Sequence, residues 1–186
     1  MITAPLVLFT MLGSASCSAS LEASMSENPQ QTAEAIVAPS ANFTPDYVTD
    51  VQDQRRLAGL ADAIFVGEVL EQIGTKSITE GIPETQFRVQ VVESLKGDLS
   101  GQVTVNQAMI DGDTPIAPGT SYIFSTLSLP SENWHTIVPN VGRIDLSPDD
   151  AHKVENGAQS RSANTDEPES VRNMKDSIAN EIPFTP

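Results

Sequence analysis

The chain has 186 residues, of which 25 are acidic and 10 are basic, and its formal net charge is −15 at pH 7. Such a charge repels polyanions, so it argues against nucleic acids and anionic lipid surfaces as partners. The single cysteine excludes an intramolecular disulfide. The length predicts one domain whose stability rests on burial of apolar side chains.

Residues 5 to 12 form an apolar run that is followed by Gly13-Ser14-Ala15-Ser16-Cys17. The run is too short to span a bilayer but is typical of a secretory signal, and the small residues before the cysteine suit a signal peptidase. The segment resembles a bacterial lipoprotein signal, with residues 1 to 16 as signal peptide and Cys17 as the lipidated mature N-terminus. The unusual Ser14 and the absence of a preceding Lys or Arg leave open an ordinary secretory signal or a buried thiol.

The next segment, residues 17 to 45, is polar and poor in aromatic side chains. It offers little apolar surface to offset the entropy lost on ordering, which predicts a disordered segment. With Cys17 lipidated, this segment would be a lipid-anchored tether. We therefore expect an extracytoplasmic protein held to the membrane by its lipid alone, with soluble secretion as the alternative.

A short helix is expected after the tether. Thr49 is its predicted N-cap, and Asp50 stands in the first turn, where the helix dipole favours an acid. We expect this helix to end between Gly59 and Ala61.

Short segments rich in β-branched and aromatic residues then follow one another, separated by Gly, Pro or Asn. The expected strands are residues 63 to 70, 86 to 91, 102 to 105, 122 to 127, 134 to 138 and 142 to 146. Strands that are not separated by helices favour antiparallel pairing, and barrel closure removes exposed edges. The sequence predicts a mainly β protein: a small antiparallel five- to six-stranded OB-like barrel over residues 46 to 146, with short flanking helices.

Residues 147 to 186 are expected to form a C-terminal helical tail. Ser147 is a good N-cap with Pro148 in the first helical position, and Gly157 is expected to stop that helix. A second helix is predicted over residues 167 to 180. Its apolar stripe, Val171, Met174 and Ile178, either packs on its own domain or binds a partner.

Three segments carry a family resemblance: residues 61 to 69 (ADAIFVGEV), 87 to 97 (FRVQVVESLKG) and 118 to 124 (PGTSYIF). They resemble the netrin-like domain, which tissue inhibitors of metalloproteinases share with many bacterial exported proteins. The resemblance covers roughly residues 61 to 146 and implies a five-stranded OB-type barrel. Those inhibitors bind the protease zinc through a free N-terminal cysteine held by disulfides, a mechanism that does not carry over, because lipidation would acylate Cys17 and no second cysteine exists.

The sequence offers no catalytic constellation. His135 and His152 are the only histidines and stand on different elements, so no zinc spacing or catalytic triad is formed. Asp111-Gly112-Asp113 lacks the further acids of a calcium loop and is better read as a turn. We therefore expect no catalytic residue, no metal site and no cofactor.

Three amphipathic aromatic residues, Trp134, Tyr122 and Tyr47, are candidate interface anchors, although aromatic residues of small β domains also pack simply in the core. The expected function is a noncatalytic, membrane-anchored module that binds a protein or glycan at the cell envelope. The alternatives are an inhibitor of an extracytoplasmic hydrolase, acting through loops such as residues 111 to 118, and an enzyme with an unrecognised site.

Overall fold

The computed structural model describes residues 40–42, 45–47, 49–159 and 166–185. The expected signal peptide, Cys17 and most of the expected tether lie outside the described residues. Six strands and three helices follow one another in the described chain: α1 (Gln54–Leu60), β1 (Ala63–Gly74), β2 (Glu84–Lys96), β3 (Gln102–Ala108), β4 (Ser121–Leu129), β5 (Trp134–Ile137), β6 (Arg143–Asp145), α2 (Pro148–Gln159) and α3 (Glu169–Ala179).

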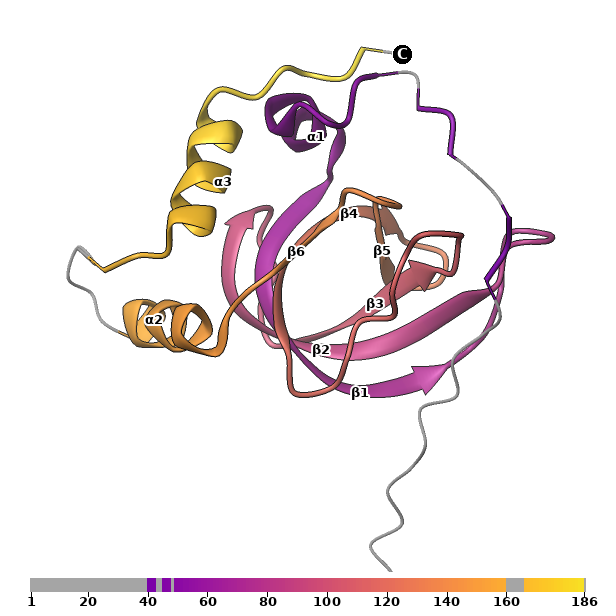
Figure 1. Cartoon of the computed structure of the whole chain (residues 1–186), viewed down its shortest axis with the longest axis horizontal. Coiled ribbons are helices and arrows are strands. Elements are labelled where there is room, and N and C mark those ends of the chain that lie inside the picture. The colour runs from indigo at the N-terminus through magenta and orange to yellow at the C-terminus, as the bar shows by residue number, and fades with distance from the viewer. Residues whose placement is uncertain (1–39, 43–44, 48, 160–165, 186) are drawn as a thin grey trace, which may run out of the picture. The chain divides into compact units, whose positions relative to one another are not determined.

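Five strands close into a barrel in the order β1-β2-β3-β5-β4, and β4 pairs back with β1 (Figure 1). β6 adds to β4 as an extra strand. The predicted mainly β class, the OB-like barrel and all six strand positions are confirmed. Irregularities in the β1–β2 register bend this long hairpin, as closure of a small barrel requires.

One strand pair departs from the expected antiparallel pattern: β3 and β5 run parallel, with Thr104 opposite Trp134. β5 returns from β4 in an antiparallel hairpin and enters the gap between β4 and β3. The parallel pair is therefore the seam that completes the barrel.

Two apolar clusters lie on opposite faces of the strands, as alternation along a strand requires. The barrel interior includes Phe65, Phe87, Val105 and Phe124. The second cluster lies between the outer face of the barrel and the helices: Ala58, Ala61, Ile64, Val66, Ile123, Leu146, Val154, Val171 and Met174.

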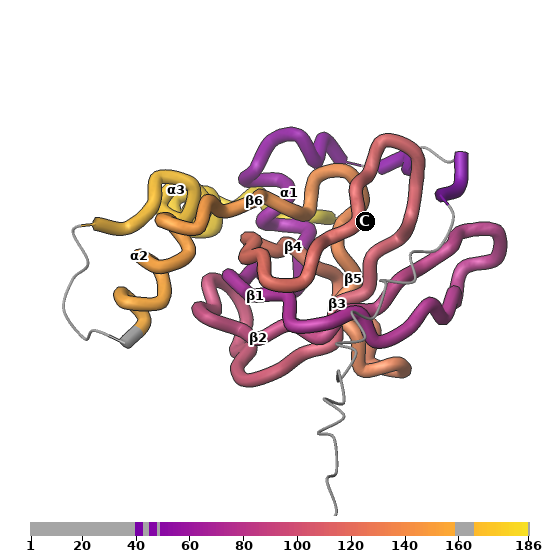
Figure 2. Tube along the Cα trace, turned by 60° about the horizontal axis from the view of Figure 1, so that its bottom comes forward, coloured from indigo at the N-terminus to yellow at the C-terminus, as the bar shows by residue number. Residues whose placement is uncertain are grey.

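The helices cover this outer face of β1, β2 and β4. α1 contacts α3, while α2 and α3 contact β2, and Figures 1 and 2 place α2 and α3 next to each other. Val171 and Met174 are buried and Ile178 packs against them, so the prediction that the C-terminal stripe packs on its own domain is confirmed. Lys175 fixes α3 to the barrel through an ion pair with Glu93 of β2 at 2.7 Å.

The helix termini differ from those expected. Asp53, not Thr49, caps α1, because its carboxylate accepts the Arg55 amide at 2.9 Å; Asp50 instead closes a turn with the Gln52 amide at 3.1 Å. Gly157 does not stop α2, which continues to Gln159. Ser147 caps α2 as predicted, since its hydroxyl accepts the Asp150 amide at 3.2 Å.

The described residues before α1 also contact the barrel. The Ala41 amide donates to the Met109 carbonyl at 2.8 Å, and the Ala41 carbonyl accepts from Asp111 at 3.0 Å. The segment assigned to the tether thus includes a residue paired with the barrel. None of the helices in the described ranges has the length and apolar character needed to cross a bilayer.

Candidate functional site

The outer face of β2, β3 and β5 carries a row of polar side chains that ends on the single tryptophan. Arg88 of β2 lies opposite Thr104 of β3, which lies opposite Trp134 of β5. Phe87 and Val105, next to Arg88 and Thr104, point into the barrel. His135, next to Trp134, contacts Phe65 there, so the side chains of the row point outward. Arg88 also pairs with the exposed Glu71 of β1 at 2.5 Å, so one row crosses four strands.

Trp134 has two charged neighbours that come from the loops on either side of it. The Lys76 ammonium, from the β1–β2 loop, lies 5.4 Å from the centroid of the Trp134 ring, within the range of a cation–π contact. The same ammonium lies 2.5 Å from a carboxylate oxygen of Glu132 in the β4–β5 turn. The ion pair thus joins the two loops above a half-buried indole.

A ladder of buried amides fixes the loop that carries Lys76. The Gln86 amide holds the Lys76 backbone at both ends, accepting its N–H at 2.8 Å and donating to its carbonyl at 2.9 Å. Gln86 also donates to Asn106 at 2.7 Å, and Asn106 donates to Thr136 of β5 at 3.4 Å. Gln86 and Asn106 are almost fully buried, so their hydrogen bonds are costly to break.

The arrangement brings groups of several chemical kinds onto one face. It combines one aromatic ring with cationic, hydroxyl and amide groups on a rigid sheet. The surrounding face adds the exposed Gln102 and the half-buried Gln90. Groups of this kind recognise a polar ligand that also has an apolar face.

Two of the three aromatic residues singled out from the sequence lie away from this face. Tyr122 is 5% exposed and packs in the barrel, where its hydroxyl accepts the Ala117 amide at 3.1 Å, so this candidate anchor has the core position that was the alternative. The Tyr47 hydroxyl donates to the Pro139 carbonyl at 2.9 Å. Burial, followed by the nearby charge of Asp113, raises the pKa of Tyr47 to about 12. The structure therefore does not bring the three together.

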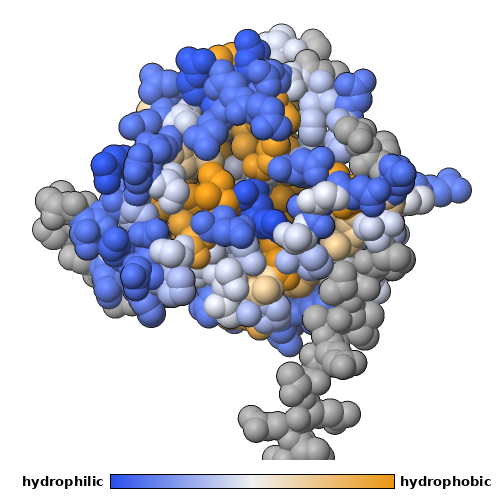
Figure 3. All heavy atoms as spheres, in the orientation of Figure 1, coloured by the Kyte–Doolittle hydropathy of each residue, from blue (hydrophilic) through white to orange (hydrophobic). Residues whose placement is uncertain are grey.

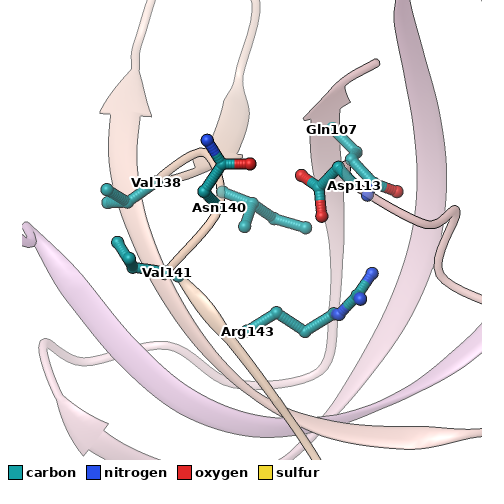
Figure 4. A pocket seen from close by; sticks show the side chains of 8 residues that line it. Gln107, Asp113, Val138, Asn140, Val141 and Arg143 are labelled. Atoms are coloured by element: carbon teal, nitrogen blue, oxygen red, sulfur yellow. The ribbon is translucent and has the colours of Figure 1, made fainter. Parts of the chain in front are cut away.

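A second polar site lies beside β6 (Figure 4). Asp113, Asn140 and Arg143 point toward one cavity of about 30 Å³, which has room for about one water molecule. The Arg143 guanidinium donates to the carbonyl and hydroxyl of Thr114 and stacks over the Tyr122 ring. These contacts fix the loop that follows β3 and leave no room for an organic ligand.

The histidines are separate, as the sequence suggested. The His135 ring lies edge-on to the Phe65 ring, with 6.4 Å between the ring centroids. Its buried Nδ1 has no hydrogen-bond partner among the described residues. Burial lowers the pKa of His135, while the charge of Asp62 partly opposes this. His152 is exposed on α2, 3.5 Å from Glu155. Within the described ranges no three His, Cys, Asp or Glu side chains gather as a metal site would require.

Sequence reasoning identified Trp134 but not the residues that position it. Gln86 and Thr136 fall within the predicted strands, whereas Asn106 and Lys76 lie outside them. Polar residues alternating with Phe87, Val89 and Val105 were the available signal, because they mark the outer face of each strand. No known family model matches the chain, and no curated protein matches it.

Proposed function

We propose that the protein is a noncatalytic, extracytoplasmic binding module that recognises a neutral glycan at the cell envelope through the outer face of β2, β3 and β5. The observation that carries this proposal is the half-buried Trp134 ring at one end of the row of outward polar side chains, beside a loop whose backbone is held by the Gln86 amide. OB-type barrels use this face and the two adjoining loops for oligonucleotides and oligosaccharides. That correspondence is an analogy of fold.

Charge favours the saccharide over the oligonucleotide. A net charge of −15 repels a polyanion, whereas a neutral sugar carries no such penalty. Sugar rings present an apolar face to an aromatic ring and hydroxyl groups to the surrounding side chains. Trp134 supplies the ring, while Thr104, Gln102 and Arg88 supply donors and acceptors.

Lys76 covers part of the Trp134 ring and must move aside before a sugar stacks there. Its side chain is 60% exposed, and an ion pair of this exposure contributes only about 0 to 1 kcal/mol. Displacing the Lys76 ammonium therefore costs little. The buried Gln86 ladder keeps the loop backbone in place meanwhile.

The export signal expected from residues 5 to 17 supports an envelope location. With Cys17 lipidated, residues 18 to 39 would separate the domain from the membrane. The netrin-like resemblance of residues 61 to 146 supports an exported binding barrel. The inhibitor alternative would use the loop of residues 111 to 118, part of which is fixed by hydrogen bonds with the Gln107 and Arg143 side chains.

Trp134 is the only tryptophan, so its fluorescence reports directly on this face. We expect titration of the mature protein with neutral oligosaccharides, such as chito- and cello-oligosaccharides, to change the emission. Calorimetry should show that Trp134→Ala weakens binding by about tenfold or more, the effect of losing an aromatic anchor. Trp134→Phe should retain much of the binding because it keeps a ring.

Tyr47→Ala is the matched control, since it removes an aromatic side chain away from the face. It should bind oligosaccharides as the wild type does, and thermal unfolding checks that all variants fold. Equal affinity of Trp134→Ala and wild type would overturn the proposal. A stoichiometric envelope hydrolase bound to the protein, without saccharide binding, would favour the inhibitor alternative.

A further inference from the structure

A groove separates α2 from the barrel, away from the β2–β3–β5 face. Its volume of about 390 Å³ falls within the range of small-molecule sites. Its lining residues come from β1, the turn before β4, the start of β4, the segment after β6, and α2: Glu68, Gly119, Thr120, Ser121, Leu146, Pro148, Ala151, His152 and Glu155.

One side of the groove is apolar. Leu146, Pro148 and Ala151 line it where the chain passes from β6 into α2. Leu146 is 7% exposed and belongs to the cluster beneath the helices, so this wall is fixed by the core. Figure 3 shows hydrophobic surface between the barrel and the helices, while the outward surfaces of the helices are hydrophilic.

The charged groups that line the groove are carboxylates. Glu68 of β1 and Glu155 of α2 stand on two elements that face each other across it, and no Lys or Arg is among the lining residues. Glu68 forms no ion pair with the described residues, and the neighbour of Glu155 is the His152 ring at 3.5 Å. The groove therefore has an unneutralised negative charge beside an apolar wall.

Ser121 provides an independent sign of a ligand. It lies opposite Glu68 in the β1–β4 pair, and it points outward because its neighbour Tyr122 points into the barrel. The residue is 8% exposed, and its hydroxyl makes no hydrogen bond within the described part of the chain. This hydroxyl opens onto the groove, where a ligand can replace water as its hydrogen-bond partner.

We propose that this groove binds a small organic cation, an amine carried on a short hydrocarbon chain. The ammonium pairs with Glu68 and Glu155, and one of its N–H groups, or a second polar group of the ligand, satisfies the Ser121 hydroxyl. The hydrocarbon packs on Leu146 and Ala151. A bare metal ion would leave the apolar wall unused, and an anion would be repelled by both carboxylates.

The test compares ligands of equal length that differ in charge. n-Hexylamine, 1-hexanol and hexanoate are titrated into the isotopically labelled protein, and backbone NMR shifts are followed at Ser121 and Ala151. We expect saturable shifts with hexylamine, much weaker binding of hexanol and none of hexanoate. Titration with Nα-acetyl-lysine methylamide tests whether the groove binds the ammonium of a lysine side chain more tightly than that of a free alkylamine.

Three variants and two controls complete the test. Glu68→Gln and Glu155→Gln should each weaken hexylamine binding by roughly three- to tenfold, because each removes one partly exposed ion pair. Ala151→Phe should abolish binding by filling the groove. Glu80→Gln and Ala158→Phe are the matched controls, since both residues are exposed and neither lines the groove.

Equal binding of hexylamine and hexanol, or unchanged affinity in both Gln variants, would overturn the proposal. Binding of hexanoate in preference to hexylamine would overturn it as well. Glu68→Gln and Glu155→Gln leave the apolar packing intact, so the charge requirement stays testable even if Ala151→Phe fails to fold.

Discussion

The carbonyl oxygen of Ile182 occupies the space where residue 59 would otherwise carry a side chain. A Cβ at residue 59 would clash with that oxygen, while the Ile182 amide donates to the Arg55 carbonyl of the same helix at 3.0 Å. The segment after α3 thus packs directly on the backbone of α1. Glu181, next to Ile182, pairs with Lys96 of β2 at 2.7 Å.

Gly59→Ala should displace this segment and lower the free energy of unfolding by about 1 to 3 kcal/mol, the usual cost of overpacking. The control is the same substitution in a protein that ends at residue 180. There alanine should stabilise α1 by about 0.5 to 1 kcal/mol, because it is the better helix former. Chemical denaturation measures both, and a loss of equal size in the two backgrounds would contradict the contact.

Met174 should be a main anchor of α3. It is 1% exposed and packs in the cluster between the helices and the barrel. Met174→Ala should cost about 2 to 5 kcal/mol in urea or thermal unfolding. Asn173→Ala, at an exposed neighbouring position, should stay within about 0.5 kcal/mol of wild type. If both variants unfold like the wild type, α3 contributes little to the domain.

The amide ladder should be sensitive to the loss of a single member. Asn106 is fully buried and bonds both Gln86 and Thr136. Asn106→Leu leaves both partners unsatisfied, so we expect a loss of about 1 to 3 kcal/mol and a shift in Trp134 emission as the Lys76 loop loosens. Thr104→Ala on the same strand is the control. Replacing Gln86 and Asn106 together should cost less than the sum of the single changes.

Stability should fall in mild acid because of His135. Burial holds its pKa below the usual 6.5, so the unfolded chain binds a proton more readily than the folded one. His135 contributes fully to the free energy of unfolding above about pH 6.5, and this contribution is lost as the pH falls from there toward the lower pKa of the folded state. Denaturation midpoints at successive pH values should decline less in His135→Gln. A parallel decline in wild type and variant would assign the effect to other groups.

Cys17→Ser should move the protein from the membrane fraction to the soluble extracytoplasmic fraction, because lipidation requires the cysteine sulfur. Fractionation of cells and intact-mass measurement of the purified protein check this. The thermal unfolding of the domain should not change. A wild-type protein without a lipid mass increment would contradict the anchor.

The strands could be predicted because each alternates apolar with polar residues or carries β-branched runs. The pairing of Gln86 with Asn106, and of Asn106 with Thr136, could not, because those contacts depend on register across strands far apart in sequence. Tyr122 and Trp134 look alike as interface candidates in sequence. Their positions on opposite faces of the barrel wall follow only from the strand register.

The ends of the helices could not be predicted accurately, because several neighbouring residues carry similar capping or terminating signals. Thr49, Asp50 and Asp53 are all acceptable N-caps, and the choice depends on which carboxylate reaches a free amide. A glycine lowers the stability of a helix but does not end it where tertiary packing holds the adjacent turns in place. Val154, one turn before Gly157, packs in the core, and α2 continues to Gln159.

The way in which the barrel closes also governs when it can form. Ala63 pairs with Thr126, and β5 enters its place between β3 and β4 only after both of those strands exist. Contacts this distant in sequence form slowly, so the early hairpin of β1 and β2 remains unclosed while the rest of the chain is still absent. If the chain crosses a membrane N-terminus first, the barrel can therefore close only after β4 and β5 have emerged on the far side.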